Sequence, residues 1–409
     1  MAAPATPRAA AGNRPWSALR RGSFTRAQWA VLIGGFLVNV GSFSIYPYLA
    51  VLLRERMGVG MAQVGVVLGA ATLVQFASAP ATAAVAERVG LKRALVAALT
   101  LYSLGGAAFL AGQRFPVLTV AGLLLISGGG SLYSPAYRSY LVHEVGDEQR
   151  PRLVSAGNAA GNLGIAVGPV VGALFVHRPT VMFAAVTTVY AGVALGHVFL
   201  RRERQVADAP PVEPFRRMLH GVAVLPFVVT AVSFYVHMQF YQYLSSYAQG
   251  RMATLLFGAA MMGYSLGLVV VQPLVAERVG RMSYPAAMAI GFGALATGMA
   301  AFAVGNGPAV VCGVAAISAG SAVLFLKNDL EALAGSRRSA TVAFGQQRLA
   351  VGVGSFLSGV AGGSVYGAFE QVGFLPGFWL VVAAQCVVLP VLVLTVGRWL
   401  GRRVPQQGS

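Results

Sequence analysis

Apolar residues occur in long runs along almost the whole chain, and short Gly, Pro or charged segments separate them. An α-helix needs about 20 residues to cross the ~30 Å hydrocarbon layer of a membrane, and each of these runs is long enough. The pattern predicts twelve transmembrane helices, near residues 27–53, 61–84, 93–112, 117–138, 153–175, 181–200, 220–243, 252–275, 285–304, 309–327, 344–366 and 374–397.

Composition supports an all-α, polytopic membrane protein. Of the 409 residues, 56% are hydrophobic and only 10% are charged, which is outside the range of soluble domains. The net charge of +18 would suggest a nucleic-acid partner in a soluble protein. In a membrane protein the positions of the basic residues instead carry information about topology.

The basic residues are distributed asymmetrically between the two sides of the membrane. With the N-terminus in the cytoplasm, 25 of the 30 Lys and Arg residues fall in the two tails and the cytoplasmic connections. The positive-inside rule therefore predicts a multi-pass protein of the cell (plasma) membrane with both termini cytoplasmic. Residues 1–26 read as a disordered basic cytoplasmic tail without a signal peptide, and 398–409 as a second cytoplasmic tail.

One six-residue segment occurs twice. The sequence VAERVG at 85–90 returns at 275–280, 190 positions later. The same offset places Gly130 and Ser131 on Gly320 and Ser321.

This repeat predicts two pseudo-symmetric six-helix bundles, at 27–200 and 220–397, joined by a basic, proline-containing cytoplasmic linker at 201–219. Because six is even, the halves have the same orientation and are related by an axis along the membrane normal.

The two VAERVG segments, which follow the predicted second and eighth helices, carry a resemblance to the major facilitator superfamily. Lys92 and Arg93 follow the first copy, and Arg281 follows the second. The order is similar to the loop motif of that family, with Glu87 and Glu277 where the family usually has Asp. The resemblance extends over all twelve predicted helices. It implies a secondary active transporter whose two bundles enclose a substrate cavity.

A second motif lies in the predicted fifth helix. Gly164, Gly168, Pro169 and Gly172 resemble the GxxxGPxxGG pattern of the drug:proton antiporter branch. Glycines four residues apart allow a neighbouring backbone to approach closely, and the proline bends the helix. Ordinary small-residue packing is the alternative explanation. The resemblance favours an exporter, similar to bacterial multidrug exporters.

In the superfamily fold, the first, fourth, seventh and tenth helices line the cavity. The resemblance therefore makes their polar and aromatic residues candidates for substrate binding, and packing is the alternative for each Tyr or Phe. An ionisable residue at membrane depth, as His237 is, normally faces a cavity. The candidates are Asn39, Tyr46, Ser131, Tyr133, Tyr137, Tyr235, His237, Gln239, Tyr241, Ser321 and Phe325.

Acidic residues are absent from the middle of every predicted helix. A desolvated cation needs a countercharge, whereas the cations Arg138, Lys327 and Arg348 cluster near the cytoplasmic ends, so we expect neutral or anionic amphipathic substrates. The candidates for proton coupling are His237, whose reference pKa is about 6.5, and Asp329 and Glu331 near the end of the tenth helix.

The repeated loop also predicts two gates. We expect Glu87 to approach Arg138, and Glu277 to approach Lys327, when the cytoplasmic side closes, with the loop glycines allowing tight turns. The alternative is that these charges only fix topology, since a solvated pair is worth about 0–1 kcal/mol. The gating candidates are Glu87, Arg88, Gly90, Arg138, Glu277, Arg278, Gly280 and Lys327.

Other chemistries have little support. The segment 263–267 matches a GxSxG hydrolase pattern but falls inside a predicted helix. Cys312 and Cys386 fall in predicted helices, so we expect them to pack as apolar residues and not to form a disulfide or a metal site. The sequence shows neither a nucleotide-binding loop nor metal-ligand spacing. We expect no enzymatic activity, cofactor, metal, nucleotide or nucleic-acid partner, and a monomer in the lipid bilayer.

The combined prediction is a proton-coupled exporter of small amphipathic compounds that works by alternating access. A proton-coupled uptake symporter is the first alternative, and a non-transporting membrane receptor or scaffold is the second.

Overall fold

The computed structural model describes residues 24–143, 149–201, 219–336 and 340–403. These residues form helices joined by short connections, with no β-strand among them. In this part of the chain eleven helices are long and apolar enough to cross a membrane, and one bent pair of helices makes a twelfth span. The all-α, twelve-span fold expected from the apolar runs is therefore confirmed.

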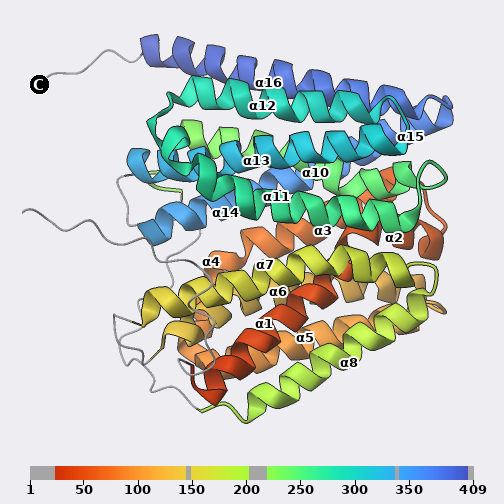
Figure 1. Ribbon diagram of the computed structural model, residues 1–409, viewed down its shortest axis with the longest axis vertical. Helices are drawn as coiled ribbons and strands as arrows, with labels where there is room; N and C mark the ends of the chain where they lie inside the picture. Colours follow the sequence, from red (N-terminus) through yellow and green to blue (C-terminus); the bar gives the residue numbers. More distant parts are fainter. Residues whose placement is uncertain (1–23, 144–148, 202–218, 337–339, 404–409) are drawn as a thin grey trace, which may run out of the picture.

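The helices form two groups, which Figure 1 shows one above the other. The first contains α1 (Arg26–Ile45), the 3-10 turn η3 (Tyr46–Tyr48), α2 (Leu49–Met57), α3 (Met61–Ala77), α4 (Ala79–Val89), α5 (Leu91–Ala111), α6 (Pro116–Val142), α7 (Arg150–Phe175) and α8 (Pro179–Val198). The second contains α10 (Val224–Ala248), α11 (Thr254–Arg281), α12 (Tyr284–Phe302), α13 (Gly307–Gly335), α14 (Ala340–Leu357), the π-helical turn η4 (Ser358–Gly362), α15 (Gly363–Gln371) and α16 (Leu375–Arg403).

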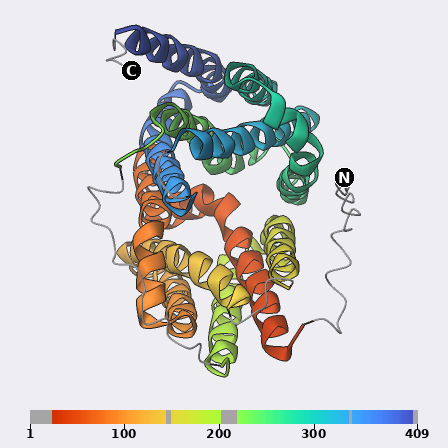
Figure 2. The same ribbon diagram turned by 90° about the vertical axis from the view of Figure 1, so that its left-hand side faces the viewer.

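The bundle has two ends with different connections. We call the end at which α1 begins and α4, α6 and α8 finish the basic end, because the positively charged connections lie there; it is on the left in Figure 1 and faces the viewer in Figure 2. At the opposite end, α2, α7, α10 and α15 finish. The orientation expected from the sequence places the basic end in the cytoplasm.

Three spans are interrupted within the membrane-crossing length, which the apolar runs alone do not predict. The 3-10 turn η3, with Pro47 at its centre, separates α1 from α2. The second span bends by 49° between α3 and α4, two residues before Pro80. Because proline has no backbone N–H and its ring clashes with the preceding turn, both breaks have a local cause. The third is the π-helical turn η4, which contains Gly359.

Ser131 of α6 fixes the bend between α3 and α4. Its hydroxyl lies 2.7 Å from that of Ser78, and its carbonyl oxygen accepts a 2.9 Å hydrogen bond from the Thr82 hydroxyl. These bonds satisfy polar groups at a helix break in an apolar environment. Hydrogen bonds within the first half therefore stabilise the bend.

The two VAERVG copies adopt different local structures. At the first copy, α4 ends at Val89 and Gly90 has φ +99°, a value that favours glycine, so the tight turn expected there is confirmed. At the second copy, α11 continues through Gly280 to Arg281. The expected turn at Gly280 is wrong, because the chain reverses after Met282 instead.

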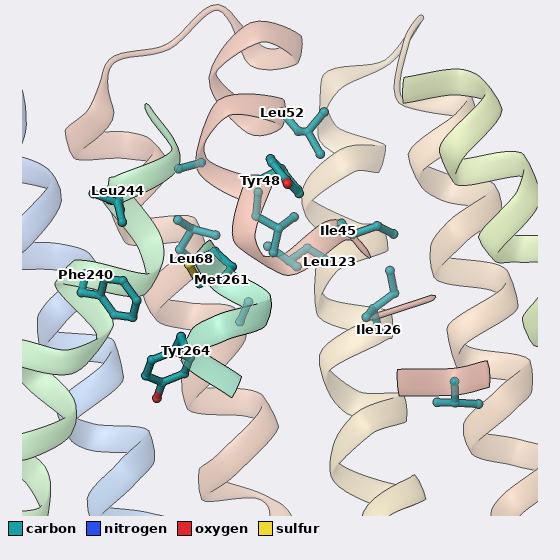
Figure 3. Packing of buried hydrophobic residues seen from close by; sticks show 14 of the residues in the cluster. Ile45, Tyr48, Leu52, Leu68, Leu123, Ile126, Phe240, Leu244, Met261 and Tyr264 are labelled. Atoms are coloured by element: carbon teal, nitrogen blue, oxygen red, sulfur yellow. The ribbon is translucent and has the colours of Figure 1, made fainter. Parts of the chain in front are cut away.

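One buried apolar cluster runs through both groups of helices. Figure 3 shows part of it, in which Tyr48 and Leu68 of the first half lie near Leu244 and Met261 of the second. The halves are thus joined by a common core.

Candidate functional site

The glycines of the predicted fifth helix, now α7, face α1. A Cβ atom at Gly164 would lie 2.5 Å from the Phe36 carbonyl oxygen, and one at Gly168 would lie 2.6 Å from the Phe43 Cβ. Real Cβ atoms do not approach this closely, so only glycine permits the observed spacing. The predicted close approach along this face is confirmed.

The carbonyl group of Pro169 in α7 contacts both the first span and α11 of the second half. It accepts a 2.7 Å hydrogen bond from the Tyr48 hydroxyl of the first span. A Cβ atom at Gly258 of α11 would lie only 2.8 Å from the same oxygen. This contact joins the two halves near the opposite end.

A second contact between the halves runs between α3 and the α14–η4–α15 span. A Cβ atom at Gly359 would lie 2.7 Å from the Gly69 Cα, and one at Gly363 would lie 2.6 Å from the Met61 carbonyl oxygen. The hydroxyl of Tyr243 donates a 2.8 Å hydrogen bond to the Gly359 carbonyl oxygen. We call this backbone-to-backbone contact the glycine seam, defined by Gly65, Gly69, Gly359 and Gly363.

An ion pair joins the halves at the opposite end. The Arg54 guanidinium of α2 lies 2.5 Å from the Glu370 carboxylate of α15, and the two side chains are 42% and 30% exposed. Together with the Pro169 contact and the glycine seam, this pair holds the opposite end closed.

An aromatic cluster surrounds His237 in the second half. The Tyr264 hydroxyl lies 3.3 Å from Nε2 and the Ser321 hydroxyl 3.4 Å from Nδ1. The imidazole ring contacts Phe325 edge to face, with centroids 5.3 Å apart. Tyr241, one helical turn after His237 on α10, contacts the same ring. His237 is 4% exposed, so both ring nitrogens depend on these two hydroxyls.

Tyr46 brings the first half to this cluster. It lies at the break between α1 and α2, close enough to Tyr102, Tyr190 and Tyr241 for electrostatic interaction. The Tyr102 ring is 6.3 Å from that of Tyr133, centroid to centroid. The structure therefore gathers Tyr46, Tyr133, His237, Tyr241, Ser321 and Phe325 around the contact between the halves.

Other candidates face elsewhere. Gln239 donates a 2.9 Å hydrogen bond to Gln385 of α16, and Tyr235, one turn before it, lies on the same face of α10. Residues two apart on a helix point in nearly opposite directions, so Gln239 and His237 face different neighbours. We correct the expected placement of Gln239 and Tyr235 accordingly.

Three candidates in the first half pack within it. Asn39 donates to the Gly35 carbonyl oxygen of its own helix at 2.8 Å. Tyr137 lies against Gly35 and its hydroxyl reaches the Gly157 carbonyl oxygen at 3.4 Å. Ser131 is engaged at the α3–α4 bend. The alternative of simple packing thus describes their contacts.

Charged side chains lie near the basic end, between the halves. Arg348 of α14 is exposed although it lies within a membrane span, and its guanidinium is 6.0 Å from the Phe76 ring of α3. It interacts electrostatically with Arg138 of α6 and Asp329 of α13, which are also exposed. Arg348 was expected only as one of the cations near the cytoplasmic ends, and Tyr264 was not among the candidates.

The gating candidates form other contacts in this structure. Lys327 is 5% exposed, donates to the Met282 carbonyl oxygen at 2.6 Å and lies 3.0 Å from the Glu331 carboxylate. Glu277 pairs with Arg281 at 2.5 Å, and both side chains are about four-fifths exposed. The structure therefore does not bring Glu277 to Lys327. The remaining loop candidates, Glu87, Arg88 and Arg278, are exposed.

Several buried polar atoms near these clusters have no hydrogen-bond partner among the described residues. They include the Tyr133 hydroxyl, the side-chain amide oxygen and nitrogen of Gln242, and the side-chain amide oxygen of Gln347. Buried polar groups are normally satisfied by protein, water or ligand. These atoms can bind water or a polar group of a transported molecule.

The sequence profile of the Major Facilitator Superfamily matches residues 31–357. The chain belongs to this superfamily. In this member of the superfamily, the contacts described above join the two six-helix bundles at the opposite end.

The chain is similar in sequence to curated members of the family. It is 30% identical over 165 residues to an uncharacterized MFS-type transporter of Mycobacterium tuberculosis, which covers 40% of this chain and 39% of that protein. It is 25% identical over 212 residues to the multidrug resistance protein MdtH of Klebsiella pneumoniae, covering 51% and 52%. The match thus spans about two fifths to one half of the length of these relatives.

Solved structures share the fold of the chain. The nucleoside transporter NupG superimposes with a TM-score of 0.74 at 15% identity, over 91% of this chain and 99% of that one. The human organic anion transporter MFSD10 superimposes with a TM-score of 0.62 at 17% identity, over 90% and 99%. At these identities the likeness establishes the fold alone.

Proposed function

We propose that this transporter exports small amphipathic compounds, neutral or anionic, in exchange for protons. In this proposal it is a monomer in the cell membrane, the basic end faces the cytoplasm, and the structure is the state that opens inward. Substrate enters between the bundles from the basic end and leaves when the opposite end opens.

The charge balance near the basic end is the observation that carries the substrate class. Arg138 and Arg348 lie exposed on opposite halves, and Asp329 is the acidic group in electrostatic contact with Arg348. Two guanidinium groups against one carboxylate give a positive entrance, which attracts anions and disfavours cations. Further in, the aromatic residues around Tyr46 and Tyr241 offer surfaces for an apolar body.

Export as the direction rests on two further supports. The glycine motif of α7 resembles the antiporter pattern, and its close contact with α1 is in place. The relative in Klebsiella pneumoniae is named a multidrug resistance protein.

Direction is tested with energised cells and a panel of toxic amphipathic compounds. A deletion strain should accumulate more of at least one compound, and the cloned transporter should restore its efflux. Higher accumulation in cells that carry the transporter would instead identify an importer. Absence of flux for every compound would favour the receptor or scaffold alternative.

Substrate charge is tested by competition. Against efflux of an identified substrate, tetraphenylphosphonium should compete poorly and an aromatic carboxylate of similar size should compete well. Competition by the phosphonium at the affinity of the substrate itself would refute the charge argument.

Asp329 is the proposed proton-coupling residue, in preference to His237 and Glu331. It is exposed and can exchange protons with water, whereas His237 is buried among aromatic rings and Glu331 is paired with Lys327. Asp329→Asn should abolish transport driven by an imposed pH gradient but retain exchange of labelled for unlabelled substrate. His237→Gln is the comparison variant, and loss of gradient dependence in it alone would reassign the role to the imidazole.

A further inference from the structure

A cavity of about 400 Å³ lies between the halves at the opposite end. Its walls come from α2 and the α7–α8 connection on one side, and from α10, the α10–α11 connection and α11 on the other. None of the residues considered above for substrate binding lines it. Its volume lies within the range of small-molecule sites.

The polar groups of this cavity favour a cation. Glu55 is the carboxylate among the lining residues, and it has neither an ion pair nor a hydrogen bond among the described residues. The arginines on either side of it are engaged elsewhere. Arg54 pairs with Glu370, and Arg56 donates to the Phe109 carbonyl group and lies over the Phe183 ring.

Further groups face the cavity from the other walls. Ser245 of α10 lines the cavity, and its buried hydroxyl has no hydrogen-bond partner in the part of the chain that the structure describes. The His177 imidazole lies 3.4 Å from the Thr254 hydroxyl across the halves. Arg251 of the α10–α11 connection is held against Tyr247, to whose carbonyl oxygen it donates at 2.7 Å.

Aromatic and aliphatic side chains complete the walls. Tyr48 and Phe257 meet edge to face with centroids 5.5 Å apart, one from each half, and Val176 lies beside them. An aromatic ring of modest size fits such a surface.

We propose that this cavity is a binding site for a small arylalkyl ammonium compound, distinct from the transport path, whose occupation holds the opposite end closed. The ammonium group pairs with Glu55 and hydrogen-bonds to the Ser245 hydroxyl, and the aryl group packs against the wall that Tyr48 and Phe257 form. Because its walls belong to both halves, the site is complete only while they are in contact. A ligand that binds one state stabilises that state by mass action.

Binding is tested on the full-length protein with 2-phenylethylammonium as the probe and 2-phenylethanol as the neutral probe of the same shape. The ammonium compound should raise the melting temperature, and the alcohol should not. Glu55→Gln should weaken its binding by about tenfold, and Ser245→Ala by about threefold. Glu55→Asp should retain binding, and Arg114→Gln, outside the cavity at the same end, should leave it unchanged.

The effect on transport separates this site from the substrate path. The ammonium compound should lower the maximal rate without raising the KM for substrate, and Glu55→Gln should transport at the normal rate but resist inhibition. The melting temperature of each variant without probe shows whether it is folded. Equal binding by the alcohol or by Glu55→Gln, or a rise in KM, would overturn the proposal; so would the absence of stabilisation by the ammonium compound.

Discussion

The helical face on which a residue lies decides the contacts of the candidate site. His237 and Tyr241 are one turn apart on α10 and their rings contact each other, whereas Gln239 lies between them in sequence and bonds to α16. In the sequence, His237, Gln239 and Tyr241 are alike, because each is a polar position within one apolar run. Only their angular separation around the helix axis distinguishes them.

Loss of the Arg54–Glu370 pair should shift the population of states. Arg54→Gln should open the opposite end more often, because removing one partner abolishes the attraction between α2 and α15. The pair is partly exposed and worth about 0–1 kcal/mol, so the population shift should be about fivefold at most. Distances between spin labels at Val117 and Val372, both exposed at this end, measure it.

The charge-reversed double variant Arg54→Glu with Glu370→Arg provides the control. It should restore the original distance distribution, because the attraction is re-formed with the partners exchanged. A distribution in Arg54→Gln identical to the wild type would show that the pair carries no closing energy.

The sequence predicted contacts within a helix pair better than contacts between halves. The spacing of Gly164 and Gly168 was enough to predict close packing of α7, because four-residue spacing keeps residues on one face. Arg54 and Glu370 are 316 positions apart, and nothing local indicates that they meet. Their contact depends on the relative position of the two bundles.

Breaks within spans set the arrangement of the elements. Pro47 and Pro80 were visible in the sequence, but helices also accommodate proline without a break, as α11 does at Pro273. The bend near Pro80 also depends on the neighbouring helix α6, because Ser131 hydrogen-bonds to residues on both sides of the bend. A span boundary can therefore be predicted from one segment, whereas a bend depends on its neighbours.

The glycine seam gives a prediction at the scale of elements. Gly359→Ala should destabilise the protein by about 1–3 kcal/mol, because the added methyl group would clash with the backbone at Gly65 and Gly69. Thermal unfolding in nanodiscs measures the change. Transport should fall as well, since α3 and η4 would be held apart.

A matched glycine lies on α11. A methyl group at Gly263 would meet no atom within 4 Å, so Gly263→Ala should leave the melting temperature unchanged or raise it slightly. Equal melting temperatures for the Gly359 and Gly263 variants would show that the seam is more pliable than its geometry indicates.

At the scale of the whole molecule, the two ends are held by different means. The opposite end combines an ion pair, a carbonyl contact and the glycine seam. At the basic end the described ion pairs, Arg281–Glu277 and Lys327–Glu331, each lie within the second half. The predicted gates therefore concern the state in which the basic end closes.

Glu87→Gln should favour the state in which the basic end is open. In the closed state we expect Glu87 to approach Arg138, and the amide variant cannot form that pair. Glu277→Gln should have a weaker effect, because Lys327 lacks the two-pronged guanidinium geometry and is already bonded to Met282 and Glu331.

Distances between labels at Phe199 and Ala334, near the basic end of each half, test this expectation during turnover. Normal membrane insertion with a longer mean distance is the expected result for Glu87→Gln. An unchanged distribution would leave the repeated loop with a role in topology alone.

The glycine seam also bears on the integrity of the membrane. Protons cross apolar layers along files of hydrogen-bonded water, and such a file needs a continuous gap lined by polar atoms. Where Gly65 lies directly against Gly359, the two backbones leave no width for a water molecule. In this structure the protein is thus electrically tight along this line, and many copies can reside in one membrane without dissipating the proton gradient across it.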